Sequence, residues 1–137
     1  MVDPERLARL LRSVSDDVGR LEPHAVAAVD DVLGDDVRLD HVKYRFITAI
    51  EAVVDTAHHI CATEGLRSPA TNADAVRELA EHDVLPKELA DEVARAVGFR
   101  NILVHRYAEV VDAHVVDQLT RLTALRDFVR AVSDRYL

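Results

Sequence analysis

The chain has 137 residues, of which 49% are apolar and 31% charged, which suits a single folded domain over residues 1–137 and excludes a disordered chain. Aspartate and glutamate outnumber lysine and arginine by 25 to 17, and the net charge of −8 argues against a protein that coats nucleic acid non-specifically. A single cysteine, Cys61, excludes an intramolecular disulfide and a cysteine-based zinc site. Without a long apolar run or an apolar leader, the sequence predicts a soluble cytoplasmic protein that makes no membrane contact.

The first predicted helix begins at Asp3-Pro4-Glu5, because aspartate caps a helix and a proline at the first helical position removes no donor that the helix needs. Its apolar face consists of residues at three- and four-residue spacings: Leu7, Leu10, Leu11, Val14 and Val18. Pro23 interrupts this pattern, which resumes over residues 24–33. This arm is therefore either two helices or one helix bent at the proline, and a solvated turn is expected over residues 30–36.

The most regular pattern begins near Leu39 and predicts a long core helix that stops at Gly65. A polar connection follows, in which Thr71 or Asn72 caps a short helix. Pro86 then opens the next helix.

On the helix after Pro86, a basic residue occupies the position that follows the apolar stripe. Leu89, Val93 and Val97 lie on one face, and the next position on that face is Arg100. A terminal helix follows Tyr107, with apolar residues at helical spacing: Val115, Leu119, Leu122, Val129 and Val132. The whole pattern predicts an all-α, up-and-down bundle of four main helices with additional short helices.

The one electropositive stretch of this acidic chain lies between Glu92 and Glu109, where no acidic residue occurs. Its basic residues are Arg95, Arg100, His105 and Arg106, within the string Gly98-Phe99-Arg100-Asn101-Ile102-Leu103-Val104-His105-Arg106-Tyr107. An arginine and a histidine five residues apart also occur at Arg77 and His82, but without an asparagine after the arginine or a tyrosine two residues after the histidine. Only the stretch around Arg100 therefore has a specific pattern.

The string at Arg100, His105 and Tyr107 resembles the Arg-x-x-x-x-His-x-Tyr signature of the HepT-like branch of the HEPN superfamily, small helical toxins of prokaryotic toxin–antitoxin pairs. Asn101 fits the preference of that family for a polar residue after the arginine. Three flanking segments are also similar to family sequences: Ala49-Ile50-Glu51-Ala52, Val84-Leu85-Pro86 and Gly98-Phe99. The resemblance extends from about Leu39 to the C-terminus, and the first arm matches only in helical character.

The resemblance implies a metal-independent endoribonuclease toxin of a type VII-like pair, acting without a cofactor as a homodimer whose Arg100 and His105 side chains face a shared cleft. Cleaving RNA without a metal requires a base for the ribose 2′-hydroxyl, an acid for the leaving oxygen, and cations that hold the phosphate. Histidine can act as base or acid at cellular pH, and a symmetric dimer brings two copies of His105, Arg100 and Asn101 together. These three residues are the predicted catalytic group.

The resemblance further implies a partner, a minimal nucleotidyltransferase (MNT) antitoxin, which in some family pairs transfers AMP to the motif tyrosine. Here that residue is Tyr107, where an adenylate would place an anion beside the motif cations. Tyr107 is also a candidate for orienting His105 or contacting RNA. Weaker candidate RNA contacts are Arg95, Arg106, Tyr44 and Arg45, the last two competing with an ordinary surface or interfacial pair.

Three other interpretations stay open at this point. In the first, the chain is a catalytically silent binding module of a nucleotidyltransferase complex. In the second, it is a plain helical interaction protein in which Arg100, Asn101 and His105 form a structural hydrogen-bond network. The third concerns His58-His59 with Glu51 and Asp55, which have a spacing that metal sites sometimes use; no second ligand cluster supports it, and we expect no metal site.

Overall fold

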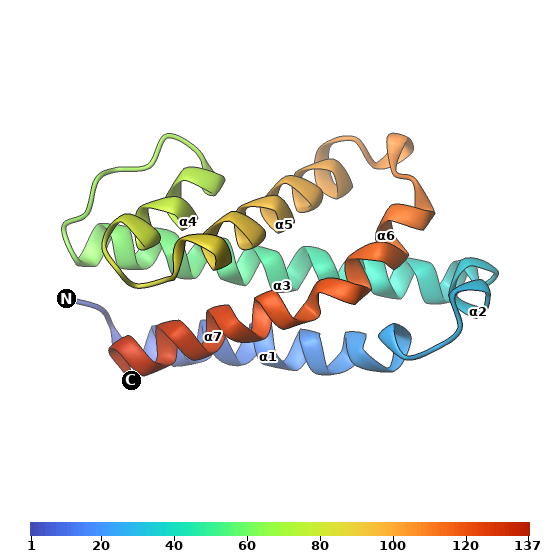
Figure 1. Cartoon of the computed structure of the whole chain (residues 1–137), viewed down its shortest axis with the longest axis horizontal. Coiled ribbons are helices and arrows are strands. Elements are labelled where there is room, and N and C mark those ends of the chain that lie inside the picture. Colours follow the sequence, from blue (N-terminus) through green and yellow to red (C-terminus); the bar gives the residue numbers. More distant parts are fainter.

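The computed structural model describes all 137 residues, which form helices joined by turns (Figure 1). In chain order the elements are α1 (Pro4–Ala25), α2 (Val29–Leu33), α3 (Asp36–Thr63), α4 (Asn72–Glu81), α5 (Lys87–His105), the 3-10 turn η1 (Tyr107–Glu109), α6 (Asp112–Gln118), the 3-10 turn η2 (Leu119–Arg121) and α7 (Leu122–Tyr136). The predicted all-helical class is confirmed. None of the helices combines the length and apolar composition needed to cross a membrane.

The four long helices α1, α3, α5 and α7 alternate in direction and form the predicted up-and-down bundle (Figure 1). The short helix α4 packs beside the C-terminal half of α3, and both chain termini lie at that end of the bundle, whereas α2 and α6 lie at the other end. One continuous core joins the long helices and α4, and its largest fully buried side chains include Leu7, Leu21, Ile50, Ile60, Leu79, Leu103 and Phe128. Burial of this apolar surface is the main force that holds the bundle together.

The first arm contains two helices, but the break does not fall at Pro23. Asp3 caps α1 as predicted, with its Oδ1 accepting from the backbone N–H groups of Glu5 at 3.1 Å and Arg6 at 3.2 Å. The helix then continues through Pro23 to Ala25, and α2 starts only at Val29. Pro23 lies in the last turn, where the loss of one backbone donor does not stop the helix.

The long helix and the helix after it begin and end close to the predicted residues. Asp35 caps α3, accepting from the backbone N–H of Arg38 at 3.0 Å, so the helix starts three residues before Leu39. Gly65, with a φ of 65°, follows its end. Thr71 caps α4, since its Oγ1 accepts from the backbone N–H of Asp74 at 3.0 Å, which decides between Thr71 and Asn72.

The prediction of one continuous terminal helix is wrong, because the turn η2 separates α6 from α7. The Thr120 hydroxyl donates to the carbonyl oxygen of Asp117 at 2.7 Å, and such local side-chain bonds compete with regular helix geometry. At Arg121 the backbone has a φ of −115° and a ψ of 17°, outside the helical region. Because of this break, Gln118 and Arg121 lie at a bend beside α5 rather than along a straight helix.

Candidate active site

Helix α5 carries the motif and ends within it. Pro86 is the residue before its first turn, and His105 is its last residue. The backbone of Arg106 leaves the helical region at a φ of −135° and a ψ of 45°, while its N–H still donates to the carbonyl oxygen of Ile102 at 2.9 Å. Tyr107 then begins η1. The motif residues therefore lie on the last turns of α5 and on the turn that follows it.

Arg100 points toward α3 and is largely covered. Its Nη2 donates to Oε1 of Glu51 at 3.0 Å, and its Nη1 donates to Oδ1 of Asn101 at 3.2 Å. Only 13% of the Arg100 side chain is exposed, and its Nε atom is buried without a hydrogen-bond partner. A guanidinium carries five N–H donors, so Arg100 retains capacity for a further acceptor such as a phosphate oxygen.

Asn101 and His105 lie on one face of α5, four residues apart, and both are exposed. They line an open groove between the end of α5 and the segment leading into α7, together with Arg95, Gly98, Phe99, Ile102, Arg106, His114, Asp117 and Gln118. The His105 ring makes no hydrogen bond or ion pair within the chain. An exposed imidazole without a structural partner is free to exchange a proton with a bound ligand.

Arg100 and His105 of one chain do not face the same side. Five helical residues correspond to a rotation of about 140° around the helix axis. Arg100 accordingly contacts Glu51 on α3, whereas His105 lines the groove on the other side of α5. Asn101 links the two sides, because it accepts a hydrogen bond from Arg100 and also lines the groove of His105.

Tyr107 is half exposed, with 51% of its surface accessible, and lies over α3. Its hydroxyl donates to Oδ1 of Asp40 at 3.3 Å, and the Lys43 ammonium lies 5.1 Å from its ring centroid. Lys43 also pairs with Asp112 at 3.0 Å. Burial disfavours the charged ammonium, but the hydrogen bond and charge of Asp112 outweigh it, and the pKa of Lys43 is raised. Tyr107 thus has an accessible hydroxyl in a polar setting and makes no hydrogen bond to His105.

The weaker candidates divide between two surfaces. Arg95 and Arg106 line the groove of His105, and Arg106 also pairs loosely with Glu109 at 3.6 Å. Tyr44 and Arg45 line a different groove, between α1 and α3, which Glu51 also borders. The Arg45 guanidinium there bonds Asp17 at 3.1 Å and lies 5.5 Å from the Tyr44 ring. Arg45 therefore has a structural partner, Asp17 on α1, and neither Tyr44 nor Arg45 lines the groove of His105.

Asp17→Ala is expected to destabilise the protein, because Asp17 is a buried carboxylate that accepts from Arg45 and from the Thr48 hydroxyl at 2.5 Å. Its loss leaves a partly covered guanidinium unpaired, which should lower the free energy of unfolding by about 2 kcal/mol after allowance for solvent screening. The midpoint of thermal unfolding should fall by roughly 5–10 °C. The exposed neighbour Asp16, changed to alanine, is the matched control. Equal melting temperatures for the two variants would contradict the structural role of the Asp17–Arg45 pair.

The two histidines of the alternative metal site, His58 and His59, have other partners in the structure. His58 Nε2 lies 2.9 Å from Oδ1 of Asn72, and His59 Nε2 accepts from the backbone N–H of Asp3 at 3.0 Å. No group of three histidine, cysteine, aspartate or glutamate side chains is arranged to hold a metal ion. Cys61 is buried, and burial raises the pKa of its thiol, which makes it a core residue rather than a nucleophile.

Sequence reasoning missed two neighbours of the motif. Glu51 belongs to one of the flanking segments and is a candidate only for the alternative metal site, and its contact with Arg100 joins residues 49 positions apart. His114 has no predicted role, yet it lines the groove of His105 because the chain reverses through η1 before α6 begins. The spacing of residues along the sequence indicates neither contact, since both depend on how separate helices pack.

The sequence matches the model of one protein family over most of its length. The model of the family described as ribonuclease HepT-like matches residues 14–132. The chain belongs to the ribonuclease HepT-like family. The predicted membership in the HepT-like family is therefore confirmed, and the match also includes most of the first arm.

The chain is also similar to individual proteins. The mRNA nuclease HepT of Shewanella oneidensis is 36% identical over 80 residues, which are 56% of this chain and 60% of that protein's own length. A protein of Archaeoglobus fulgidus described as a putative RNase is 26% identical over 113 residues, covering 80% of this chain and 83% of that protein. A solved structure of the tri-AMPylated HEPN toxin of Shewanella oneidensis in complex with its MNT antitoxin has a TM-score of 0.87 at 24% identity, covering 98% and 99% of the two chains. The last likeness establishes the HEPN fold.

Proposed function

We propose that this HepT-like protein is an endoribonuclease toxin that cleaves RNA without a metal ion, using Arg100, Asn101 and His105. The observation that carries the proposal is the exposed His105 ring, which lies without a partner in a groove that also contains Asn101, Arg95 and Arg106. The nuclease and RNase names of its relatives support the same reaction class.

The proposed chemistry assigns one task to each motif residue. His105 takes the proton from the ribose 2′-hydroxyl, or returns a proton to the leaving oxygen. Arg100 and Asn101 offer N–H donors to the phosphate as negative charge develops on its oxygens. Arg95 and Arg106 attract the RNA backbone to the groove. All of these groups act on phosphate and ribose, which are common to every RNA sequence.

A homodimer is part of the proposal, because a single chain presents Arg100 and His105 on different sides of α5. A twofold partner would bring a second copy of each residue to the same cleft. The exposed apolar side chains of Val104 and Val111 near the motif support an interface there.

Purified protein should cleave a mixed cellular RNA pool in the presence of EDTA, which removes metal-dependent contaminants. Intact RNA after incubation would contradict the proposed nuclease activity, once mass spectrometry shows that Tyr107 is unmodified.

We also propose an MNT antitoxin as partner and Tyr107 as the residue that receives AMP. The half-exposed hydroxyl, held only by Asp40 at 3.3 Å, is open to an approaching enzyme. The HEPN toxin in the Shewanella complex is itself tri-AMPylated, which supports such a modification in a protein of this fold. An adenylate here would place a phosphate anion near Lys43 and Arg106, where it would weaken the attraction of these cations for the RNA backbone.

After co-expression with the cognate nucleotidyltransferase, the intact mass of the toxin should increase by the mass of adenylate, and peptide mapping should locate an adenylate on Tyr107. Tyr107→Phe should remove that adenylate, because it deletes the accepting hydroxyl. Tyr44→Phe is the matched control, since Tyr44 is an equally exposed tyrosine on α3. A toxin that leaves the co-expression without adenylate on Tyr107 would count against the partner's proposed action.

One observation favours the second candidate, a catalytically silent binding module. Arg100 is already engaged by Glu51 and Asn101, as a purely structural arginine would be. This candidate predicts a tight complex with the nucleotidyltransferase and no RNA cleavage by either wild type or variants.

A further inference from the structure

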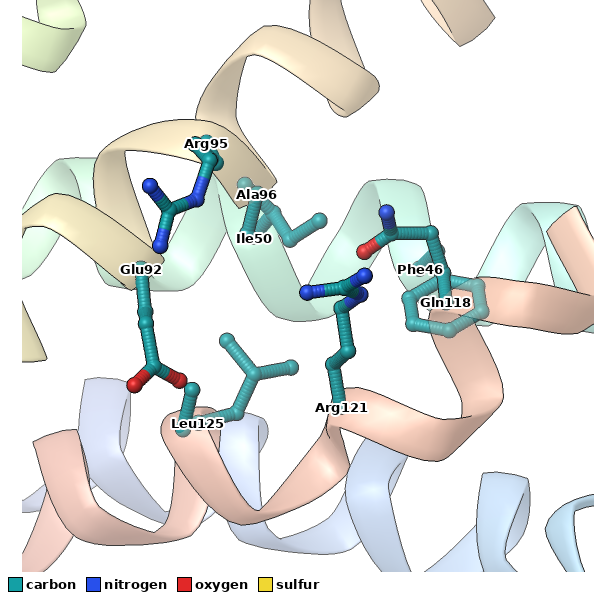
Figure 2. A pocket seen from close by; sticks show the side chains of 9 residues that line it. Phe46, Ile50, Glu92, Arg95, Ala96, Gln118, Arg121 and Leu125 are labelled. Atoms are coloured by element: carbon teal, nitrogen blue, oxygen red, sulfur yellow. The ribbon is translucent and has the colours of Figure 1, made fainter. Parts of the chain in front are cut away.

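A small cavity lies beside the groove of His105, where α3, α5 and the bend at η2 meet (Figure 2). Its volume is about 190 Å³, and it is lined by Phe46, Ile50, Glu92, Arg95, Ala96, Gln118, Arg121, Ala124 and Leu125. We call it the η2 pocket. Ligand pockets for drug-sized molecules hold roughly 300–1,000 Å³, so the η2 pocket suits a single planar ring system and not a larger molecule.

The η2 pocket combines an apolar interior with a charged rim. Ile50 and Leu125 form its interior, with small side chains beside them that leave the space open. Figure 2 shows the guanidinium groups of Arg95 and Arg121 on either side of the opening and Glu92 below Arg95. The rim thus offers N–H donors from two arginines, an acceptor from Glu92, and both from the Gln118 amide.

The rim cations are available to a ligand. Arg95 is exposed and forms no ion pair within the chain. Arg121 has only a loose contact with Asp117 at 3.5 Å, one helical turn away, which is worth little in solvent. Two guanidinium groups at the rim of an apolar cavity indicate a ligand with flat apolar faces and hydrogen-bonding atoms along its edge.

The η2 pocket and the groove of His105 share Arg95 and Gln118. A ligand strand that has a phosphate in the groove can therefore place the chemical group next to that phosphate in the η2 pocket. Arg95 can contact the phosphate at the same time. Because Asn101 and His105 line the same groove, the occupant of the η2 pocket would lie next to the reacting nucleotide.

We propose that the η2 pocket binds one unstacked nucleobase of the RNA substrate. A nucleobase has apolar faces for Ile50 and Leu125, and an edge of donors and acceptors for Glu92 and the two arginines. A base in a duplex is stacked and paired, so the substrate is single-stranded RNA or a loop whose bases can be turned out. This inference rests on the proposed role in RNA binding, and it adds the class of RNA that the site accepts.

The first test separates the base from the phosphate. Methyl-labelled protein is titrated with the four ribonucleosides, which lack phosphate, and with ribose 5-phosphate, which lacks a base. At least one nucleoside should shift the NMR signals of the Ile50, Ala96 and Leu125 methyl groups, whereas ribose 5-phosphate should leave them unchanged. Unchanged methyl signals with all four nucleosides, or equal shifts with ribose 5-phosphate, would overturn the proposal.

The second test measures the affinity of a single-stranded oligoribonucleotide in EDTA, on a His105→Ala background that prevents cleavage. Arg121→Gln, which removes a rim cation outside the groove, and Ala96→Leu, which fills the cavity with a good helix former, should each weaken binding roughly tenfold. Arg130→Gln is the matched control, because Arg130 is an exposed arginine of α7 with a similarly loose partner, Asp127 at 4.0 Å. Arg130→Gln should change the affinity for the oligoribonucleotide by less than about twofold, because Arg130 does not line the pocket and its exposed ion pair contributes little.

The outcomes for the pocket and for the nuclease are distinguishable. If wild-type protein cleaves RNA but Arg121→Gln and Ala96→Leu bind RNA as tightly as Arg130→Gln, the pocket proposal is wrong and the nuclease stands. If the two pocket variants lose affinity while wild type never cleaves, the pocket proposal stands and the nuclease is wrong. Circular dichroism melting checks that each variant keeps the helix content and the melting temperature of the wild type.

Discussion

RNA cleavage in EDTA should fall by roughly 10²–10⁴-fold when His105 is changed to alanine, the range expected for loss of a general acid or base. The reason is the position of the ring: it lies at the end of α5, in the groove, with no hydrogen bond inside the chain. The same exposure predicts that His105→Ala retains the melting temperature of wild type, because the substitution removes no buried contact. Cleavage rates on a defined oligonucleotide and a melting curve measured on the same sample are sufficient for this comparison.

His82→Ala is the control for His105→Ala. His82 is an exposed histidine after α4, paired with Glu78 at 3.0 Å and far from the groove in the bundle. It should leave cleavage at the wild-type rate. A His105→Ala protein that cleaves RNA as fast as wild type would remove His105 from the mechanism, and one that melts much earlier would support a structural hydrogen-bond network instead.

Two inactive variants, Arg100→Gln and His105→Ala, should regain activity when they are mixed and allowed to exchange subunits. In one chain these residues lie about 140° apart around α5. A shared cleft would therefore pair Arg100 of one protomer with His105 of the other. Half of the randomly formed dimers are mixed, and each mixed dimer contains one intact pair, so activity should reach roughly a quarter of the wild-type value.

The mixing experiment needs evidence of exchange and of association. A tag on one variant should recover the other from the mixture, and sedimentation should show a dimer at micromolar concentration. Mixed dimers without any activity would contradict the pairing of one Arg100 with one His105 across the dimer. A monomer in sedimentation would contradict the shared cleft directly.

The bundle was predictable because its signals are local. Asp3 and Thr71 cap their helices through bonds that span two or three residues, and the three- and four-residue spacing of apolar side chains matches the faces that are buried. The break at η2 was not predictable, since helical spacing continues through it while Thr120 bonds Asp117 and the backbone bends at Arg121. The spacing of apolar residues indicates which side chains are buried. It does not reveal a bend that leaves the same side chains buried.

The candidate site could likewise be predicted only in part from the sequence. Arg100, Asn101, His105 and Tyr107 were found because they share one short string, but their surroundings come from other helices. The contact of Tyr107 with Asp40 spans 67 residues, and that of Arg45 with Asp17 spans 28. Packing of α3 against α1 and against the end of α5 creates these pairs, and no spacing within a single helix encodes them.

The ion pair between Arg100 and Glu51 has a consequence for how the free protein meets RNA. A guanidinium whose side chain is 13% exposed would carry a large desolvation cost without a counter-ion, and the Glu51 carboxylate at 3.0 Å supplies one. Any phosphate that binds Arg100 through this nitrogen must therefore displace a carboxylate and not merely water. Glu51, with half of its side chain exposed, can turn into solvent when that happens. If Arg100 binds RNA as proposed, Glu51 occupies in the free protein the position that a substrate phosphate would take, and a polyanion must bind Arg100 more strongly than Glu51 does in order to replace it.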